Sequence, residues 1–113
     1  KYLMSKKKED LFVEQKIKII RLKDYLETKK IDKIDFMKID TEGYEFEVLL
    51  GAEEYIKKVK MLIFEHHYHN MLIKNYTFSD IHNLLKKYNF HQINKFKMPF
   101  RKTFEYIYIN NIR

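Results

Sequence analysis

Short apolar segments and amphipathic segments alternate along the chain, and this alternation restricts the fold more than any other feature of the sequence. Three segments have the length and apolar content of strands: "KIKIIRL" (16–22), "IDFMKID" (34–40) and "MLIFEHH" (61–67). Three others repeat apolar side chains every three or four residues, as helices do: 23–31, 44–59 and 77–89. The order predicts an α/β fold with parallel strands and flanking helices. Residues 34–40 alternate little, so we expect that strand to be covered on both faces.

The last part of the chain predicts two more strands. "FHQINKF" (90–96) and "TFEYIYIN" (103–110) alternate apolar and polar residues, and the short link between them is typical of a hairpin. This terminal hairpin would add an antiparallel edge to the sheet. A chain of 113 residues, 45% of them hydrophobic, is long enough for one core and too short for two ordinary domains. We expect residues 16–113 to form one domain and residues 1–15 to be a disordered or incomplete N-terminal segment.

Charged side chains follow two of the predicted buried strands. Asp40 and Glu42 come after the first of these strands, next to Gly43, and Glu65 and His67 end the second. In parallel sheets, ligands bind beyond the carboxyl ends of the strands. The sequence therefore predicts one shared site at this edge. Glu42 has an ordinary alternative role, because an acidic residue near the start of a helix also complements the helix dipole.

The stretch "IDFMKIDTEGYEFEVLLGAEEYI", followed by "KMLIFEHH", resembles the FkbM family of S-adenosylmethionine-dependent methyltransferases. The family pattern is a strand ending in Lys-Ile-Asp-x-Glu-Gly, then x-Glu-x-x-Val-Leu-x-Gly-Ala, then an apolar strand ending in Glu. The resemblance is closest over about 30 residues and extends more loosely from about residue 17 to 109. Either Glu45 or Glu47 corresponds to the family's glutamate after the glycine.

The resemblance implies methyl transfer to a hydroxyl, often on a sugar or a natural product, by a Rossmann-like class I methyltransferase. A hydroxylated small molecule such as a carbohydrate would then be the partner. Under this interpretation Asp40 is the first candidate to accept or organise the hydroxyl proton, Glu42 the second and Glu65 the third. His67, or its neighbour His66, is a further candidate base, because imidazole titrates near neutral pH.

The cofactor site that the family implies is not visible in this sequence. A complete family member begins with a glycine-rich turn that holds S-adenosylmethionine, and the only glycines here are Gly43 and Gly51. We therefore interpret the chain as the C-terminal half of a methyltransferase domain, inactive when isolated. The binding motif for the cofactor is expected largely outside this chain, and no cofactor-binding residue is assigned.

Histidines near the end of the second buried strand raise the question of a metal. His66, His67 and His69 lie close together in the sequence, and His67 and His69 would share a face of an extended strand. No spacing typical of a metal motif joins them to a further ligand. We favour a polar loop that contains histidines, and assign no metal ligand.

The charge and composition narrow the classes of partner. The net charge of +7 is spread thinly along the chain, without the clustered basic face of a nucleic-acid-binding surface, so a nucleic-acid partner is not expected for the enzyme. No apolar run approaches the roughly 20 residues that cross a bilayer, and there is no cysteine, so we expect a cytoplasmic protein without membrane contact. The alternative to an enzyme is a non-catalytic α/β binding module, or a degenerate remnant that interacts with a protein or a nucleic acid.

Overall fold

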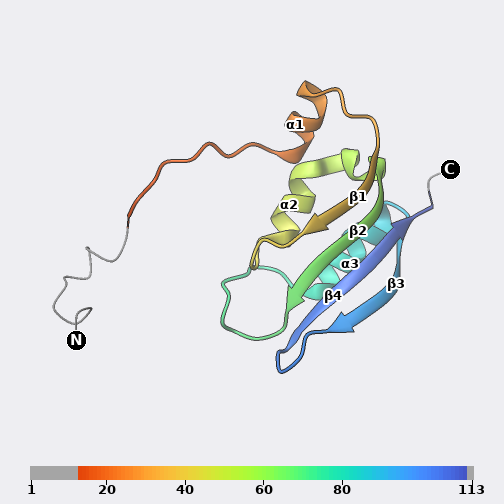
Figure 1. The fold of residues 1–113 in the computed structure, drawn as a ribbon. Helices are drawn as coiled ribbons and strands as arrows, with labels where there is room; N and C mark the ends of the chain where they lie inside the picture. Colours follow the sequence, from red (N-terminus) through yellow and green to blue (C-terminus); the bar gives the residue numbers. More distant parts are fainter. Residues whose placement is uncertain (1–12, 112–113) are drawn as a thin grey trace.

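A four-stranded sheet with helices on one side forms the body of the protein (Figure 1). The computed structural model describes residues 13–111. In chain order the elements are α1 (Leu22–Thr28), β1 (Ile34–Ile39), α2 (Glu45–Ala52), the 3-10 helix η3 (Glu53–Lys58), β2 (Val59–His67), α3 (Phe78–Lys87), β3 (Phe90–Lys97) and β4 (Thr103–Asn110). The predicted α/β class is confirmed: the protein has a small α/β fold with a mixed sheet.

The sheet has the strand order β1-β2-β4-β3. β1 and β2 are parallel, whereas β4 is antiparallel to both β2 and β3. The predicted hairpin of β3 and β4 is confirmed and forms one edge of the sheet, with β4, the antiparallel strand, on the inside. β4 suits the interior, since its alternate residues Tyr106 and Tyr108 are buried beside β2. β3 is largely exposed after Phe90 and suits the edge.

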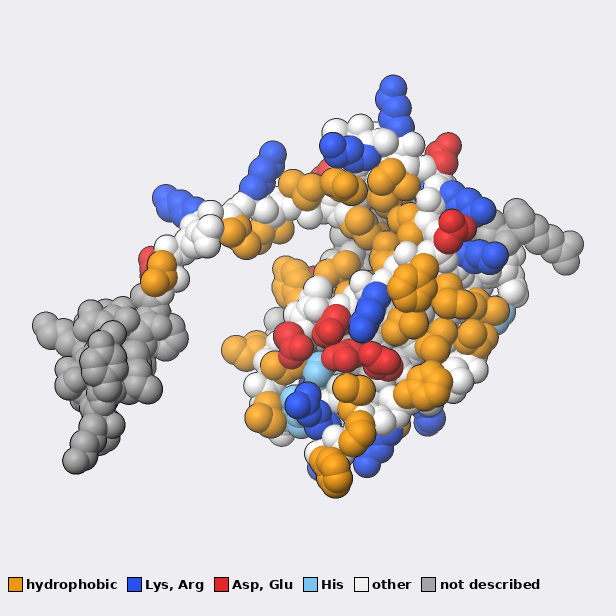
Figure 2. All heavy atoms as spheres, in the orientation of Figure 1, with side chains coloured by type: hydrophobic (Ala, Val, Ile, Leu, Met, Phe, Trp, Pro, Cys, Tyr) orange, Lys and Arg blue, Asp and Glu red, His pale blue; other side chains and the backbone are white. Residues whose placement is uncertain are grey.

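The two faces of the sheet differ in what covers them. One face carries the core, in which Phe64 of β2 stacks on Tyr106 and Tyr108 and packs with the buried residues of α2 and α3. The other face has no helix over it within residues 13–111, and Figure 2 shows hydrophobic side chains spread across it. Phe36 of β1 is 53% exposed on that side. The expectation that β1 is covered on both faces is therefore wrong for the described part of the chain.

The strand predicted at residues 16–22 is also wrong. Residues 13–21 form neither helix nor strand, and Leu22 is the first residue of α1. Ile17 and Ile19 are 74% and 82% exposed. β-branched residues favour extended backbone, but a strand also requires a partner strand, and these residues have none in the structure. Of the predicted N-terminal segment 1–15, residues 1–12 lie outside the described part of the chain.

The remaining predicted elements are confirmed, with changes at their ends. The helix expected at 44–59 is α2 followed by η3, and Val59 already belongs to β2. α3 begins after Thr77, whose side chain accepts from the backbone N–H of Asp80 while the Asp80 carboxylate accepts from that of Thr77. This reciprocal capping satisfies two donors at the helix start. None of the described helices is long and apolar enough to cross a membrane.

Candidate functional site

The turn between β1 and α2 is tightly constrained. It follows Asp40, and the backbone of both Glu42 (φ 52°) and Gly43 (φ 100°) lies in the left-handed region. A Cβ atom at Gly43 would come within 2.9 Å of the carbonyl oxygen of Ile73, so the turn is pressed against the loop that follows β2. Gly43 is therefore required here for both its backbone angle and its lack of a side chain.

The buried side chain of Glu45 stabilises this turn through hydrogen bonds. Its carboxylate is fully buried and accepts hydrogen bonds from the backbone N–H groups of Thr41 (3.1 Å) and Gly43 (3.1 Å) and from the hydroxyl of Tyr76 (2.6 Å). Burial, together with the bond to Glu45, raises the pKa of the Tyr76 hydroxyl well above its usual value of about 10. The sequence connected Glu45 only with the family pattern. The structure shows that it links the turn to the loop after β2.

Successive side chains at the end of β2 point to opposite faces of the sheet. Glu65 and His67 share the face without helices and are 9% and 6% exposed. His66 points to the covered face, where its ring contacts those of Tyr68, Tyr76 and Phe78. Burial and the nearby Lys74 lower the pKa of His66 to about 4. Of the two candidate histidines, the structure therefore brings only His67 to the site.

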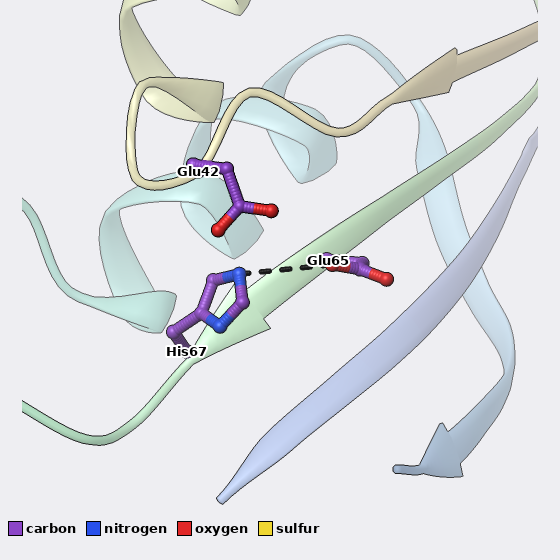
Figure 3. Close-up of side chains that lie close together, drawn as sticks. All are labelled: Glu42, Glu65 and His67. Atoms are coloured by element: carbon purple, nitrogen blue, oxygen red, sulfur yellow. Dashed lines mark ion pairs between the residues drawn. The ribbon is translucent and has the colours of Figure 1, made fainter. Parts of the chain in front are cut away.

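Glu42, Glu65 and His67 converge at the carboxyl ends of β1 and β2 (Figure 3). Each offers a nitrogen or oxygen atom, and these atoms all lie within 4.8 Å of one another. Nε2 of His67 is 3.7 Å from Oε2 of Glu65. Asp40 also belongs to this group: burial first, and then the negative charge of Asp40, raise the pKa of Glu65. The four predicted site residues therefore lie together, and we call them the acidic cluster.

The far side of the His67 ring is held by residues that the sequence did not single out. Nδ1 of His67 lies 3.0 Å from the hydroxyl oxygen of Thr103 and 3.3 Å from Nε2 of His69. Thr103 is the first residue of β4, is 1% exposed and is paired with His67 across the sheet. The expected proximity of His67 and His69 is confirmed. Thr103 follows His67 by 36 residues, and no local pattern indicates the contact.

A hollow of about 550 Å³ opens beside the acidic cluster. It is lined by Glu42, His67, His69, Met71, Leu72, Phe100, Arg101 and Lys102. Acidic, histidine and basic side chains gather at this end of the sheet in Figure 2. Lys38 adds a nearby cation, since its Nζ lies 3.7 Å from Oε1 of Glu105. A small polar molecule in the hollow would contact the Glu42 carboxylate and the His67 imidazole on one side and basic groups on the other.

The profile of the methyltransferase FkbM domain matches residues 3–91, well over half of the chain. This protein belongs to the FkbM methyltransferase domain family. The predicted resemblance is thereby confirmed. Comparison with curated proteins and with solved structures finds no match. The matched part of the FkbM domain includes all four residues of the acidic cluster, whereas Thr103 lies after it.

The described part of this FkbM domain does not build a glycine-rich cradle for S-adenosylmethionine. The space beside Gly43 is filled by the carbonyl group of Ile73. Gly51 lies inside α2, where the nearest atoms belong to Arg21 and Leu22. Neither glycine leaves its backbone open to a nucleotide-like ligand, so no residue among 13–111 is assigned to that cofactor.

Proposed function

We propose that this FkbM domain protein is part of an enzyme that methylates a hydroxyl oxygen of a small acceptor, a sugar or a natural product. The chain would form the C-terminal part of a Rossmann-like class I methyltransferase domain. S-adenosylmethionine would supply the methyl group, held by residues other than those described. The observation that carries the proposal is the convergence of Asp40, Glu42, Glu65 and His67 at the carboxyl ends of two parallel strands.

The acidic cluster has the groups that a hydroxyl acceptor needs. A hydroxyl becomes a better nucleophile as its proton passes to a nearby base, and a positioned general base typically contributes about 10²- to 10⁴-fold. Asp40 is exposed and lies beside Glu65, so it can receive this proton at the mouth of the site. Glu42 and His67 can orient the hydroxyl from the hollow. Holding the oxygen in one place supplies a further part of the rate.

The sugar or natural-product class of the acceptor rests on the family resemblance and on the polar lining of the hollow. Carboxylates and an imidazole favour a ligand that has several hydroxyl groups, because each hydroxyl can donate to one of them. The cytoplasmic location and the absence of a nucleic-acid partner remain predictions from the sequence.

The test is methyl transfer by the protein expressed from its complete reading frame. Labelled S-adenosylmethionine and a panel of hydroxylated acceptors, sugars included, are incubated with the wild-type protein and with Asp40→Asn. We expect at least a 100-fold lower kcat for the variant, since the amide cannot take the proton. Asp35→Asn is the matched control, because Asp35 lies on β1, the strand that Asp40 follows, with its side chain 78% exposed.

Two results would contradict the proposal at different levels. Equal turnover of wild type and Asp40→Asn would remove Asp40 from the mechanism. Absence of methyl transfer to every acceptor, by a protein that binds S-adenosylmethionine, would contradict O-methylation itself.

A further inference from the structure

A buried imidazole nitrogen faces two carboxylates without forming a hydrogen bond. Nε2 of His67 has no hydrogen-bond partner within residues 13–111, although the residue is only 6% exposed. Its distance of 3.7 Å from Oε2 of Glu65 is too long for a hydrogen bond. Buried polar atoms are nearly always satisfied, so an unpartnered nitrogen aimed into a functional site indicates a missing ion or water.

The atoms around this nitrogen form a donor set suited to a metal ion. Carboxylate oxygen and imidazole nitrogen together are common ligands of divalent first-row metals. Bonds of about 2.1 Å to a shared ion would bring neighbouring ligand atoms to about 3 to 4 Å from one another. The three atoms already lie within 4.8 Å. Glu42 is exposed and can make the remaining adjustment without disturbing the core.

Thr103 supplies the support that a metal-bound histidine usually has. A ligating imidazole commonly donates its second N–H to a nearby acceptor, which fixes the ring and its tautomer. Nδ1 of His67 can donate to the Thr103 hydroxyl at 3.0 Å, and this leaves Nε2 free of a proton. In the opposite tautomer, His69 donates from Nε2 to Nδ1 of His67 at 3.3 Å and Nε2–H of His67 faces Glu65; the backbone N–H of Met71 favours this arrangement without an ion, because it donates to Nδ1 of His69. A bound ion selects the first tautomer.

We propose that Glu42, Glu65 and His67 bind a divalent transition-metal ion of the Mn²⁺ or Zn²⁺ type, with Thr103 positioning the imidazole. The sequence alone led us to assign no metal, because no spacing typical of a metal motif joins the histidines to a further ligand. The role of the ion, though not its binding, rests on the proposed function. The ion would hold the acceptor oxygen and lower the pKa of its hydroxyl, and Asp40 would take the released proton.

Binding is tested directly with Mn²⁺, in the absence of S-adenosylmethionine and acceptor. Protein stripped with EDTA and dialysed is titrated with MnCl₂, and free Mn²⁺ is measured by electron paramagnetic resonance. We expect one tight site for each chain, from which ZnCl₂ displaces the manganese. Pulsed measurements should show coupling to one imidazole nitrogen, and this coupling should disappear in His67→Gln.

Substitutions then locate the site. Glu42→Gln and Glu65→Gln are each expected to weaken Mn²⁺ binding at least tenfold. Thr103→Val keeps the side-chain shape and should weaken it about tenfold, as loss of a supporting contact typically does. Glu54→Gln is the matched control, because Glu54 is exposed on η3 and should leave binding unchanged. Glu42 is also exposed, so its variant should fold normally, which circular dichroism checks.

The outcomes separate this inference from the proposed function. Tight binding that Glu42→Gln weakens supports the metal site, even if no methyl transfer is found. Absence of both Mn²⁺ and Zn²⁺ binding overturns it, and so does binding that is unchanged in Glu42→Gln and Glu65→Gln. Methyl transfer that persists unchanged in EDTA, without metal binding, would leave the proposed function standing and the metal site refuted.

Discussion

Two buried carboxylates on either side of the same turn have opposite surroundings. Glu45 lies beneath the turn and accepts hydrogen bonds from two backbone N–H groups and a tyrosine hydroxyl. Glu65 lies at the end of β2, where no N–H group of the described residues donates to it and the carboxyl of Asp40 faces it. A buried charge with several donors stabilises its surroundings, whereas one facing other carboxylates does not. The comparison indicates a structural role for Glu45, and the surroundings of Glu65 support its place in the proposed site.

The strongest test of this comparison removes each carboxylate in turn. Glu45→Ala leaves the N–H groups of the turn and the Tyr76 hydroxyl without their acceptor, so we expect the free energy of unfolding to fall by about 3 kcal/mol or more. Glu65→Ala should change it by less than about 1 kcal/mol in EDTA, because that carboxylate has no donors to lose. Urea denaturation followed by circular dichroism measures both values. Equal losses would show that the two carboxylates have the same role.

The second test concerns the turn that the two carboxylates flank. Gly43→Ala places a Cβ 2.9 Å from a backbone oxygen at a φ of 100°, and we expect a loss of about 2 kcal/mol. Gly51→Ala is the matched control, since its Cβ would meet nothing closer than 3.7 Å and alanine favours a helix. That variant should gain about 0.5 to 1 kcal/mol. Thermal unfolding of both proteins gives the comparison, and a stabilised Gly43→Ala would contradict the constrained turn.

The third and smallest test isolates the hydroxyl bound to Glu45. Tyr76→Phe should lose about 1.5 kcal/mol at neutral pH, as expected for one hydrogen bond to a charged group. The pKa of Tyr76 is raised in the folded protein, so its contribution is present below about pH 10 and is lost as the pH rises above that value. Above pH 10 the wild type should therefore lose about 1.4 kcal/mol for each pH unit more than the variant.

Urea unfolding at several alkaline pH values measures this slope, and tyrosinate absorbance shows when the hydroxyl ionises. Parallel slopes for the wild-type protein and Tyr76→Phe would show that the hydroxyl does not hold its proton through the bond to Glu45.

The sequence predicted those elements whose signals are local. β2 follows from an apolar run and α3 from apolar side chains that recur every three or four residues, and both are confirmed. The place of β4 could not be predicted, because a hairpin can present either of its strands to the rest of the sheet. The strand expected at 16–22 failed for a related reason: its isoleucines favour extended backbone, but strand formation depends on a partner that local sequence does not specify.

For the candidate site, the sequence predicted the clustered residues but not the contacts that support them. Asp40, Glu42, Glu65 and His67 were found because the carboxyl ends of parallel strands meet at one edge, and the structure places all four there. The supporting contacts were missed because they join residues far apart in the chain. Tyr76 reaches Glu45 over 31 residues, and Thr103 reaches His67 over 36.

The interior position of β4 has a consequence for the order in which the protein is assembled. Thr103 stands at the start of β4 and, because that strand is antiparallel to β2, meets His67 at the end of β2. While the chain is being synthesised, β1, α2 and β2 leave the ribosome before this contact can exist. The orientation of the His67 ring is therefore among the last features to be established, and a nascent chain that stops short of Thr103 carries the acidic residues without a finished site.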